Sequence, residues 1–292
     1  MARILVGASS WAHHSLVKES GWYPRKTMKA AERLGYYTSK LPLVEVDATY
    51  RFPPTPELAR QWVDRTPPGF TMDVKAWSLL TGQATIPASL WEDLQDSVRP
   101  EARDSRRLYA GHLTADALDE AWVRFEHSLR PLHDAGRLGA VMLELPHWLK
   151  AGDTGRTLLA EARRRLPDYR LTAEFRHHSW VEGDCESTLS SLEELDIGFV
   201  CVDGPGYPRV ISSTSELAVL RLYGRADEDG WPFAYRYSDE ELEDWVPAVH
   251  QLADGADEVH VLFSNAVRDF SVRNAETMQS LLSRPETNRL FD

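Results

Sequence analysis

Eight short apolar runs recur along the chain, and they constrain its fold more than any other feature. The runs cover residues 4–9, 43–47, 70–75, 140–144, 171–176, 197–203, 217–223 and 259–265. Runs this short and this rich in Val, Ile, Leu and Phe are typical of strands that are covered on both faces. Stretches with helical periodicity separate most of them, such as 28–40, 57–66, 187–195, 239–252 and 272–282. Strands that alternate with helices eight times predict an α/β fold, the (β/α)8 TIM barrel.

The length of the chain favours one domain with one insertion. A chain of 292 residues with 42% hydrophobic content suits a single TIM-barrel domain over residues 1–292, since such barrels need roughly 250 residues. About 65 residues separate the third and fourth runs, which is about twice the length of an ordinary connection. We therefore predict an insertion after strand 3, residues 79–113, over the catalytic face, followed by a helix with Thr114 as its N-cap. The segment Gly204-Pro205-Gly206-Tyr207-Pro208 predicts a loop in place of a helix after strand six.

Charge and composition argue against several classes of partner. The formal net charge is −12 and basic residues form no long run, so we do not expect nucleic acid as a ligand. No apolar stretch approaches the 18 or so residues of a membrane span, and the N-terminus lacks a signal-peptide pattern. The two cysteines, Cys185 and Cys201, do not suggest a disulfide framework or a Cys-x-x-Cys site. We expect a cytoplasmic protein, and the sequence does not specify oligomeric partners.

Carboxylates and a lysine follow or end the predicted strands, where a barrel of this kind places its chemistry. Glu45 and Asp47 alternate with valines, so we expect both on one strand face; Lys75 ends the third run and Glu174 lies in the fifth. A mixed acidic and basic cluster can shift pKa values and supply a general base. We assign these four residues as catalytic candidates. The alternative is that they form ion pairs that serve only folding.

A second set of residues at the same ends could bind a ligand. Guanidinium groups bind phosphate and carboxylate in bidentate fashion, and aromatic rings stack on sugars or bases or pack the loops. The substrate-binding candidates are Arg176, Arg221, Arg225, Tyr223, Asn265, Trp11, Tyr23 and His177. We expect the arginines to hold a small anionic ligand, and we expect Arg221 to share one pocket with Lys75, Glu174 and Arg176.

The histidines give a weak metal signal. Four of the ten histidines form the adjacent pairs His13-His14 and His177-His178, and no His-Glu-x-x-His spacing is present. Adjacent side chains in extended segments point apart, whereas zinc ligands on one helix face are three or four residues apart. We predict no metal and no cofactor.

Several ordered motifs resemble those of the DUF72 (YecE-like) family over nearly the whole chain. They are Gly7-Ala8-Ser9-Ser10-Trp11 with Trp22-Tyr23-Pro24, Val44 to Tyr50, Phe70 to Lys75, Glu174 to Trp180, Arg221 to Arg225 and Ser264-Asn265. The resemblance implies a TIM barrel and a shared ligand site at the strand ends, and it implies no particular activity. The long insertion after strand three is similar to that of an actinobacterial-type branch.

Four positions depart from the family pattern. In the family that this chain resembles, many members have His at the positions of Gln83 and Tyr223, Asn at the position of Ser264 and Gln at the position of Glu144. These departures affect any chemistry that needs those histidines. Our first hypothesis is an enzyme, a lyase, isomerase or hydrolase, that acts on a small polar, anionic, sugar-like metabolite by acid/base chemistry. The alternatives are a metal-dependent phosphodiesterase or nuclease-like barrel and a non-catalytic ligand-binding barrel.

Overall fold

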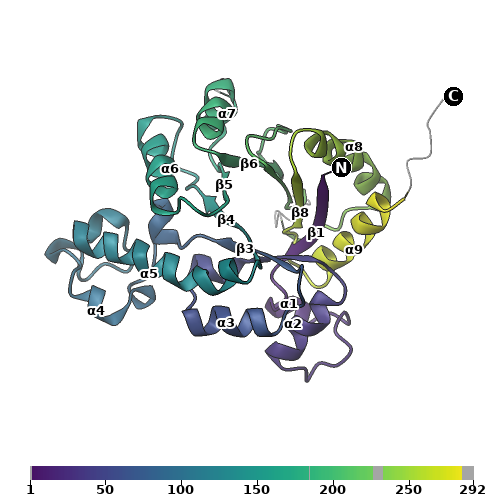
Figure 1. The fold of residues 1–292 in the computed structure, drawn as a ribbon, viewed down its shortest axis with the longest axis horizontal. Helices are drawn as coiled ribbons and strands as arrows, with labels where there is room; N and C mark the ends of the chain where they lie inside the picture. The colour runs from purple at the N-terminus through teal and green to yellow at the C-terminus, as the bar shows by residue number, and fades with distance from the viewer. Residues whose placement is uncertain (1, 184, 226–232, 285–292) are drawn as a thin grey trace. The chain divides into compact units, whose positions relative to one another are not determined.

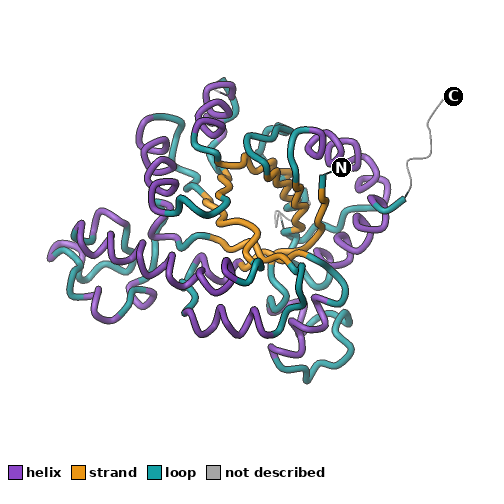
Figure 2. Tube along the Cα trace, in the orientation of Figure 1, coloured by secondary structure: helices purple, strands orange, loops and turns teal. Residues whose placement is uncertain are grey.

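The eight strands pair in chain order, from β1 to β8, as a closed parallel barrel, and this confirms the predicted TIM-barrel fold (Figure 2). The computed structural model describes residues 2–183, 185–225 and 233–284 (Figure 1). The strands are β1 Arg3–Ser9, β2 Leu43–Val46, β3 Thr71–Lys75, β4 Leu138–Glu144, β5 Leu171–Glu174, β6 Ile197–Asp203, β7 Leu217–Leu222 and β8 Glu258–Phe263. The longer helices are α2 Ala30–Thr38, α3 Pro56–Asp64, α5 Ala115–Asp134, α6 Asp153–Arg165, α7 Cys185–Glu194, α8 Asp239–Asp254 and α9 Phe270–Leu282.

All eight predicted strands are present, and their ends differ from the prediction by at most two residues. A one-residue difference with a chemical consequence is at β2, which ends at Val46. Asp47 instead begins a short 3-10 helix, η1 Asp47–Tyr50, so the expectation that Glu45 and Asp47 share a strand face is wrong in its geometry. Residues 204–216, between β6 and β7, contain no helix, as the Gly and Pro residues there predict.

The chain divides into two compact units. Unit 1 comprises Met1–Val44 and Cys201–Asp292, and unit 2 comprises Glu45–Val200. A single domain over residues 1–292 stays a prediction.

In unit 1, β8 is hydrogen-bonded to both β1 and β7. The register of β1 and β8 runs from Arg3 opposite Glu258 to Ala8 opposite Phe263. Tyr37 of α2 links α2 to the strands β1 and β2. Its hydroxyl accepts a hydrogen bond from the Ala8 amide and donates one to the Leu43 carbonyl, both at 2.8 Å. A short helix, α1 His14–Lys18, follows β1.

In unit 2, β3, β4, β5 and β6 pair in that order, with an irregular register between Met72 and Val74. The helices α3 and α5 lie side by side (Figure 1). Thr114 accepts a hydrogen bond from the Ala117 amide and so caps α5, which confirms the predicted start of this helix. The buried residues of α5 recur with the periodicity of an amphipathic helix.

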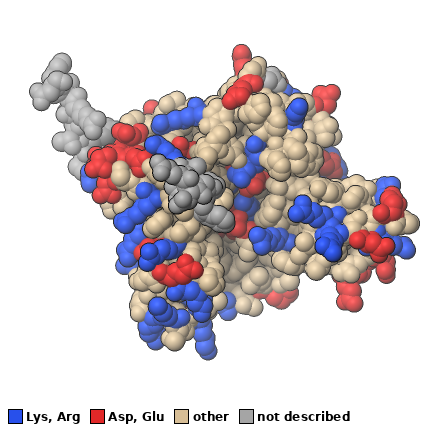
Figure 3. Space-filling model, turned by 180° about the vertical axis from the view of Figure 1, so that it is seen from behind, with Lys and Arg blue, Asp and Glu red and all other residues tan. Residues whose placement is uncertain are grey.

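The insertion after β3 contains only short elements: η2 Ser78–Thr81, η3 Pro87–Ser89, α4 Glu92–Gln95, η4 Pro100–Ala102 and η5 Ala110–His112. Arg124 of α5 holds it, since its guanidinium forms two hydrogen bonds to Asp93, at 2.7 and 2.6 Å, and lies over the Trp91 ring. The lobe that carries α4, at the right of Figure 3, shows acidic and basic side chains close together. That residues 79–113 cover the catalytic face stays a prediction.

Candidate functional site

Two glutamates end neighbouring strands of unit 2 side by side. Glu144 of β4 and Glu174 of β5 are direct partners in the strand register. Like charges at adjacent positions repel, and Arg176 lies between them: its Nη1 donates to Glu174 Oε1 at 2.8 Å, and its Nε lies 3.8 Å from Glu144 Oε1. Arg176 therefore already faces two carboxylates, which also fix its position.

Lys75 ends β3 and meets the same group of carboxylates. Its Nζ lies 2.8 Å from Glu144 Oε2, 2.9 Å from Asp47 Oδ1 and 3.9 Å from Glu45 Oε1. Lys75 is only 8% exposed and Glu45 is fully buried, whereas the Asp47 side chain is 53% exposed. Although Asp47 lies outside the strand, the short helix η1 brings its carboxylate to the same ammonium group as Glu45.

Tyr50 and Gln83 adjoin this group, and neither is among the predicted site residues. The Tyr50 hydroxyl donates to Gln83 Oε1 at 2.7 Å, and Gln83 Nε2 donates to the Glu144 carbonyl at 2.8 Å. Lys75 Nζ lies 5.4 Å from the Tyr50 ring centroid. Burial, and next the Glu144 carboxylate, raise the pKa of Tyr50, so the phenol keeps its proton at neutral pH.

We name the group Glu45, Asp47, Lys75, Glu144, Glu174 and Arg176 the Lys75 cluster. It contains two cations and four carboxylates. A nearly buried ammonium in contact with carboxylates from different elements is suited to proton transfer, because the local charges control the protonation states of both partners. Four members of the cluster, Asp47, Lys75, Glu144 and Arg176, also retain some exposure through which they could touch a ligand.

Gly82 explains how the insertion presents Gln83. Its φ of 77° is left-handed, the conformation that glycine adopts without strain, and it ends η2. The Gln83 amide then donates to the Ser78 carbonyl. This turn leads into Gln83, which lies beside Glu144. No local pattern in the sequence predicts the contact between Gln83 and Glu144.

Four predicted ligand-binding residues lie in or just after β7 and β8 of unit 1. The buried Arg221 hydrogen-bonds to the Tyr223 hydroxyl, and Arg225 pairs with Glu241 at 3.1 Å. Asn265 follows β8 and is fully buried; its Nδ2 donates to the Tyr235 carbonyl and to Asn274 Oδ1. That Arg221 lines one pocket with Lys75, Glu174 and Arg176 stays a prediction.

The amides of unit 1 hold the chain that precedes α8. Asn274 of α9 accepts from the Tyr237 amide at 3.2 Å and donates to the Tyr237 carbonyl at 2.9 Å. The Tyr237 hydroxyl donates to Asp203 at 2.7 Å, and burial, with the Asp203 charge, raises the pKa of Tyr237. These hydrogen bonds order a connection that follows β7.

The remaining candidates, Trp11, Tyr23 and His177, form local contacts. The Tyr23 hydroxyl donates to the Trp11 carbonyl, and the Tyr23 ring packs edge-on against Trp22. His177 caps a short 3-10 helix by accepting from the Ser179 amide. Loss of hydration and the adjacent His178 lower the pKa of His177. A packing role accounts for these contacts of Tyr23, and ligand binding by all three stays a prediction.

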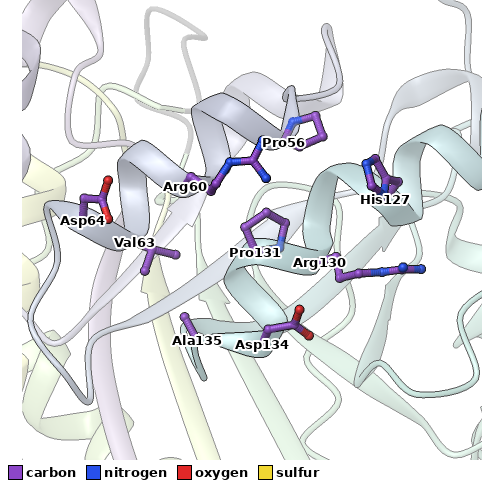
Figure 4. A pocket seen from close by; sticks show the side chains of 9 residues that line it. All are labelled: Pro56, Arg60, Val63, Asp64, His127, Arg130, Pro131, Asp134 and Ala135. Atoms are coloured by element: carbon purple, nitrogen blue, oxygen red, sulfur yellow. The ribbon is translucent and has the colours of Figure 1, made fainter.

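A separate groove of about 500 Å³ lies between α3 and α5 of unit 2 (Figure 4). In Figure 4 the Arg60 side chain and the Pro131 ring face the space between the helices, and Arg130 points away. Arg60 pairs with Glu57 and Arg130 pairs with Glu126, all near the surface. The groove therefore has the character of an ordinary surface between helices.

Neither a metal cluster nor a membrane-spanning helix is found in the part of the chain that the structure describes. Within residues 2–183, 185–225 and 233–284, no three His, Cys, Asp or Glu side chains are placed to hold a metal ion together. In the same ranges, no helix has the length and apolar character needed to cross a membrane.

Comparison with known proteins identifies the family. The model of the family described as "Protein of unknown function DUF72" matches residues 5–290. The UPF0759 protein YunF of Bacillus subtilis is 28% identical in an alignment of 298 positions that covers 96% of this chain and 94% of that protein. The crystal structure of a DUF72 family protein of Thermotoga maritima is 26% identical, with a TM-score of 0.75 over 97% of this chain and 100% of that chain. One from Enterococcus faecalis is 23% identical, with a TM-score of 0.76 over 97% of this chain and 96% of that chain. The chain therefore belongs to the DUF72 family.

Proposed function

We propose that the protein is an enzyme that transfers protons on a small polar, sugar-like metabolite, with Lys75 as the group that gives and takes the proton. One observation carries this proposal: the nearly buried Lys75 amine lies within 2.9 Å of carboxylates from two different elements, Glu144 and Asp47. A general acid or base needs partial desolvation, which shifts its pKa. It also needs a second group close by that restores its starting protonation state.

The neighbours of Lys75 have distinct proposed roles. Glu144 and the exposed Asp47 can exchange the lysine's proton with a ligand or with water, because both are within hydrogen-bond distance of it. Glu45, at 3.9 Å and fully buried, stabilises the ammonium form. Glu174 positions Arg176 through their 2.8 Å contact, so we regard it as a positioning residue and no longer as a proton-transfer group.

The anionic nature of the ligand remains a prediction. It depends on the three arginines, and two of these, Arg176 and Arg225, face carboxylates within their own units. Arg221 faces the Tyr223 hydroxyl.

Exchange of solvent deuterium tests the proposal directly. The protein would be incubated in D2O with a panel of aldoses, ketoses, sugar acids and their phosphates, and each compound would be followed by mass spectrometry for label and for products. We expect at least one compound to take up deuterium or to be converted. Lys75→Met should lower that rate by about 10² to 10⁴, the usual contribution of a general acid/base. Conversion that survives unchanged in Lys75→Met, in a folded variant, would refute the proposed role.

A further inference from the structure

Two loops of unit 2 leave the barrel together, directly after the glutamates of the Lys75 cluster. Glu144 and Glu174 are partners at the ends of β4 and β5, and the Leu145 amide continues this pairing by donating to the Glu174 carbonyl at 2.9 Å. His147 and His177 each follow three residues after these glutamates. The two loops therefore begin beside each other and beside the proposed catalytic group.

Two hydrogen bonds join the loops. Trp180 Nε1 donates to the Leu149 carbonyl at 2.8 Å, and the Ala151 amide donates to the Ser179 hydroxyl at 2.9 Å. The Trp180 ring is fully buried, and a Cβ added at Gly155 would lie 2.4 Å from it, so the first turn of α6 packs closely on the same ring. The side chains on the two loops are therefore presented from a fixed backbone.

Basic side chains gather on these joined loops. His147 and Lys150 of the first loop are exposed, and His177 of the second is partly exposed. Loss of hydration, and next the positive groups His178, Lys150 and His147, lower the pKa of His177. Among the residues that the structure describes, neither Lys150 nor His147 forms an ion pair with a carboxylate. A ligand can therefore meet this positive charge directly.

The hydrogen bonds of His177 fix which of its nitrogens faces a ligand. Its Nδ1 accepts from the Ser179 amide at 3.1 Å, so the neutral ring carries its proton on Nε2. The His178 ring stacks on it, with centroids 4.5 Å apart, and His178 itself pairs with Glu182 at 2.8 Å. His177 thus offers a hydrogen-bond donor at Nε2, while His178 neutralises the nearby carboxylate.

An exposed aromatic ring lies in the same loop. Trp148 stands between His147 and Lys150 in the chain and is 52% exposed. Its flat apolar face is suited to stacking against a sugar ring. We name the following residues the rim patch: His147, Trp148, Lys150 and His177.

We infer that the rim patch binds the phosphate group of a small phosphorylated, sugar-like ligand, with Trp148 against the sugar ring. An ammonium and imidazole N–H groups supply the positive charge and the donors that phosphate oxygens need. The net charge of −12 disfavours a long polyanion such as nucleic acid. The inference rests on the proposed function, because it assigns a place to the anionic group of that substrate beyond the three arginines.

Isothermal titration calorimetry of the whole protein tests the inference with three probes: ribose 5-phosphate, ribose and inorganic phosphate. The buffer is bis-tris propane at pH 7 with ~0.15 M NaCl, in which exposed charges more than about 8 Å apart are largely screened. We expect ribose 5-phosphate to bind most tightly and inorganic phosphate to compete with it. Ribose that binds as tightly as ribose 5-phosphate, or phosphate that does not compete, would overturn the inference.

Three variants locate the phosphate and the sugar separately. Lys150→Met should weaken both ribose 5-phosphate and inorganic phosphate by about tenfold to a hundredfold, the effect of one charge-assisted hydrogen bond. His177→Asn keeps an acceptor for the Ser179 amide and removes the Nε2 donor, so it should also weaken both. Trp148→Ala should weaken ribose 5-phosphate and leave inorganic phosphate unchanged.

Arg164→Met is the matched control, because it removes one positive charge from the exposed last turn of α6, at the opposite end of that helix from the rim patch. It should leave the affinities unchanged. Equal losses in Arg164→Met and Lys150→Met, or parent affinities in both Lys150→Met and His177→Asn, would contradict the inference.

Turnover is a separate readout. Conversion that depends on Lys75, with phosphate affinity unchanged in Lys150→Met, would refute this inference alone. Phosphate binding that depends on the rim patch, with conversion indifferent to Lys75→Met, would refute only the proposed role of Lys75.

Discussion

The two units place polar residues at strand ends in different ways. In unit 2 the groups are ionic, since Lys75 and Arg176 each contact carboxylates. In unit 1 the hydrogen bonds at the ends of β1 and β8 join neutral groups, for example the Ser9 and Ser264 hydroxyls at 2.7 Å and the amides of Asn265 and Asn274 at 2.9 Å.

The difference separates chemistry from positioning. Ionic groups that share protons can change charge during a reaction, whereas paired amides and hydroxyls have one favoured arrangement and little capacity to titrate. We therefore expect changes in unit 2 to affect protonation and turnover, and changes in unit 1 to affect mainly the order of the loops.

Breaking the ion cluster of unit 2 should have the largest effect on stability. Lys75→Met removes the cation 3.9 Å from the fully buried Glu45 carboxylate, and loss of one partner of a buried pair costs about 3 to 5 kcal/mol. Urea unfolding measures this cost. The double variant Lys75→Met with Glu45→Gln should recover part of it, because the buried charge is then also removed. If the double variant is less stable than the single one by the full cost of Glu45→Gln alone, the two residues are not coupled.

Acid should weaken unit 1 through His13. Burial lowers the pKa of His13 to about 4, from 6.5 in the unfolded chain. The unfolded chain therefore takes up the proton first, and stability is lost as the pH falls from 6.5 towards 4. Protonation would also remove the Nδ1 lone pair that accepts from the Leu16 amide. We expect a loss of about 2 kcal/mol between pH 7 and pH 5.

The control for His13 is His13→Asn, which keeps a capping acceptor without a group that titrates in this range. Chemical unfolding at both pH values should show a smaller loss for this variant than for the parent protein. The same pH dependence in both proteins would mean that His13 contributes nothing to it.

Removing the amide clamp of unit 1 should have an intermediate effect. Asn274→Leu leaves the Tyr237 amide and carbonyl without their side-chain partner and removes an acceptor from Asn265. Unpaired buried polar groups cost about 1 to 3 kcal/mol, and we expect a loss in the middle of that range by thermal unfolding. Ser280→Ala, on the exposed side of the same helix, is the control, and a similar loss in both would contradict the clamp.

The hydroxyl pair of unit 1 should have the smallest effect. Ser9→Ala removes one neutral hydrogen bond to Ser264, which is worth about 1 kcal/mol. The measurement is again unfolding by urea, and the double variant with Ser264→Ala should cost less than the two single variants combined. A cost above that of Asn274→Leu would mean that the pair does more than share one bond.

The sequence predicts the fold better than the site, for a physical reason. A local apolar run predicts each strand, and the preference of Thr for N-cap positions predicts the start of α5 at Thr114. Lys75, Glu45 and Glu174 could be found because they lie on strands whose ends meet in any barrel.

Other parts of the site depend on contacts that no local pattern contains. Asp47 leaves the strand for η1 and still reaches Lys75, and Gln83 contacts Glu144, 61 residues further along the chain. Glu144 ends its apolar run as Lys75 does, so that signal could have identified it as a catalytic candidate.

One variant from each unit, compared in the deuterium-exchange assay with the responsive substrate at saturation, tests whether chemistry belongs to the ionic cluster. Lys75→Met changes the Lys75 cluster of unit 2, and Tyr223→Phe removes the hydroxyl that faces Arg221 in unit 1. We predict that Lys75→Met lowers the maximal exchange rate by about 10² to 10⁴ and that Tyr223→Phe leaves it within a few-fold of the parent rate. A maximal rate that falls in Tyr223→Phe and persists in Lys75→Met would contradict the assignment of proton transfer to Lys75.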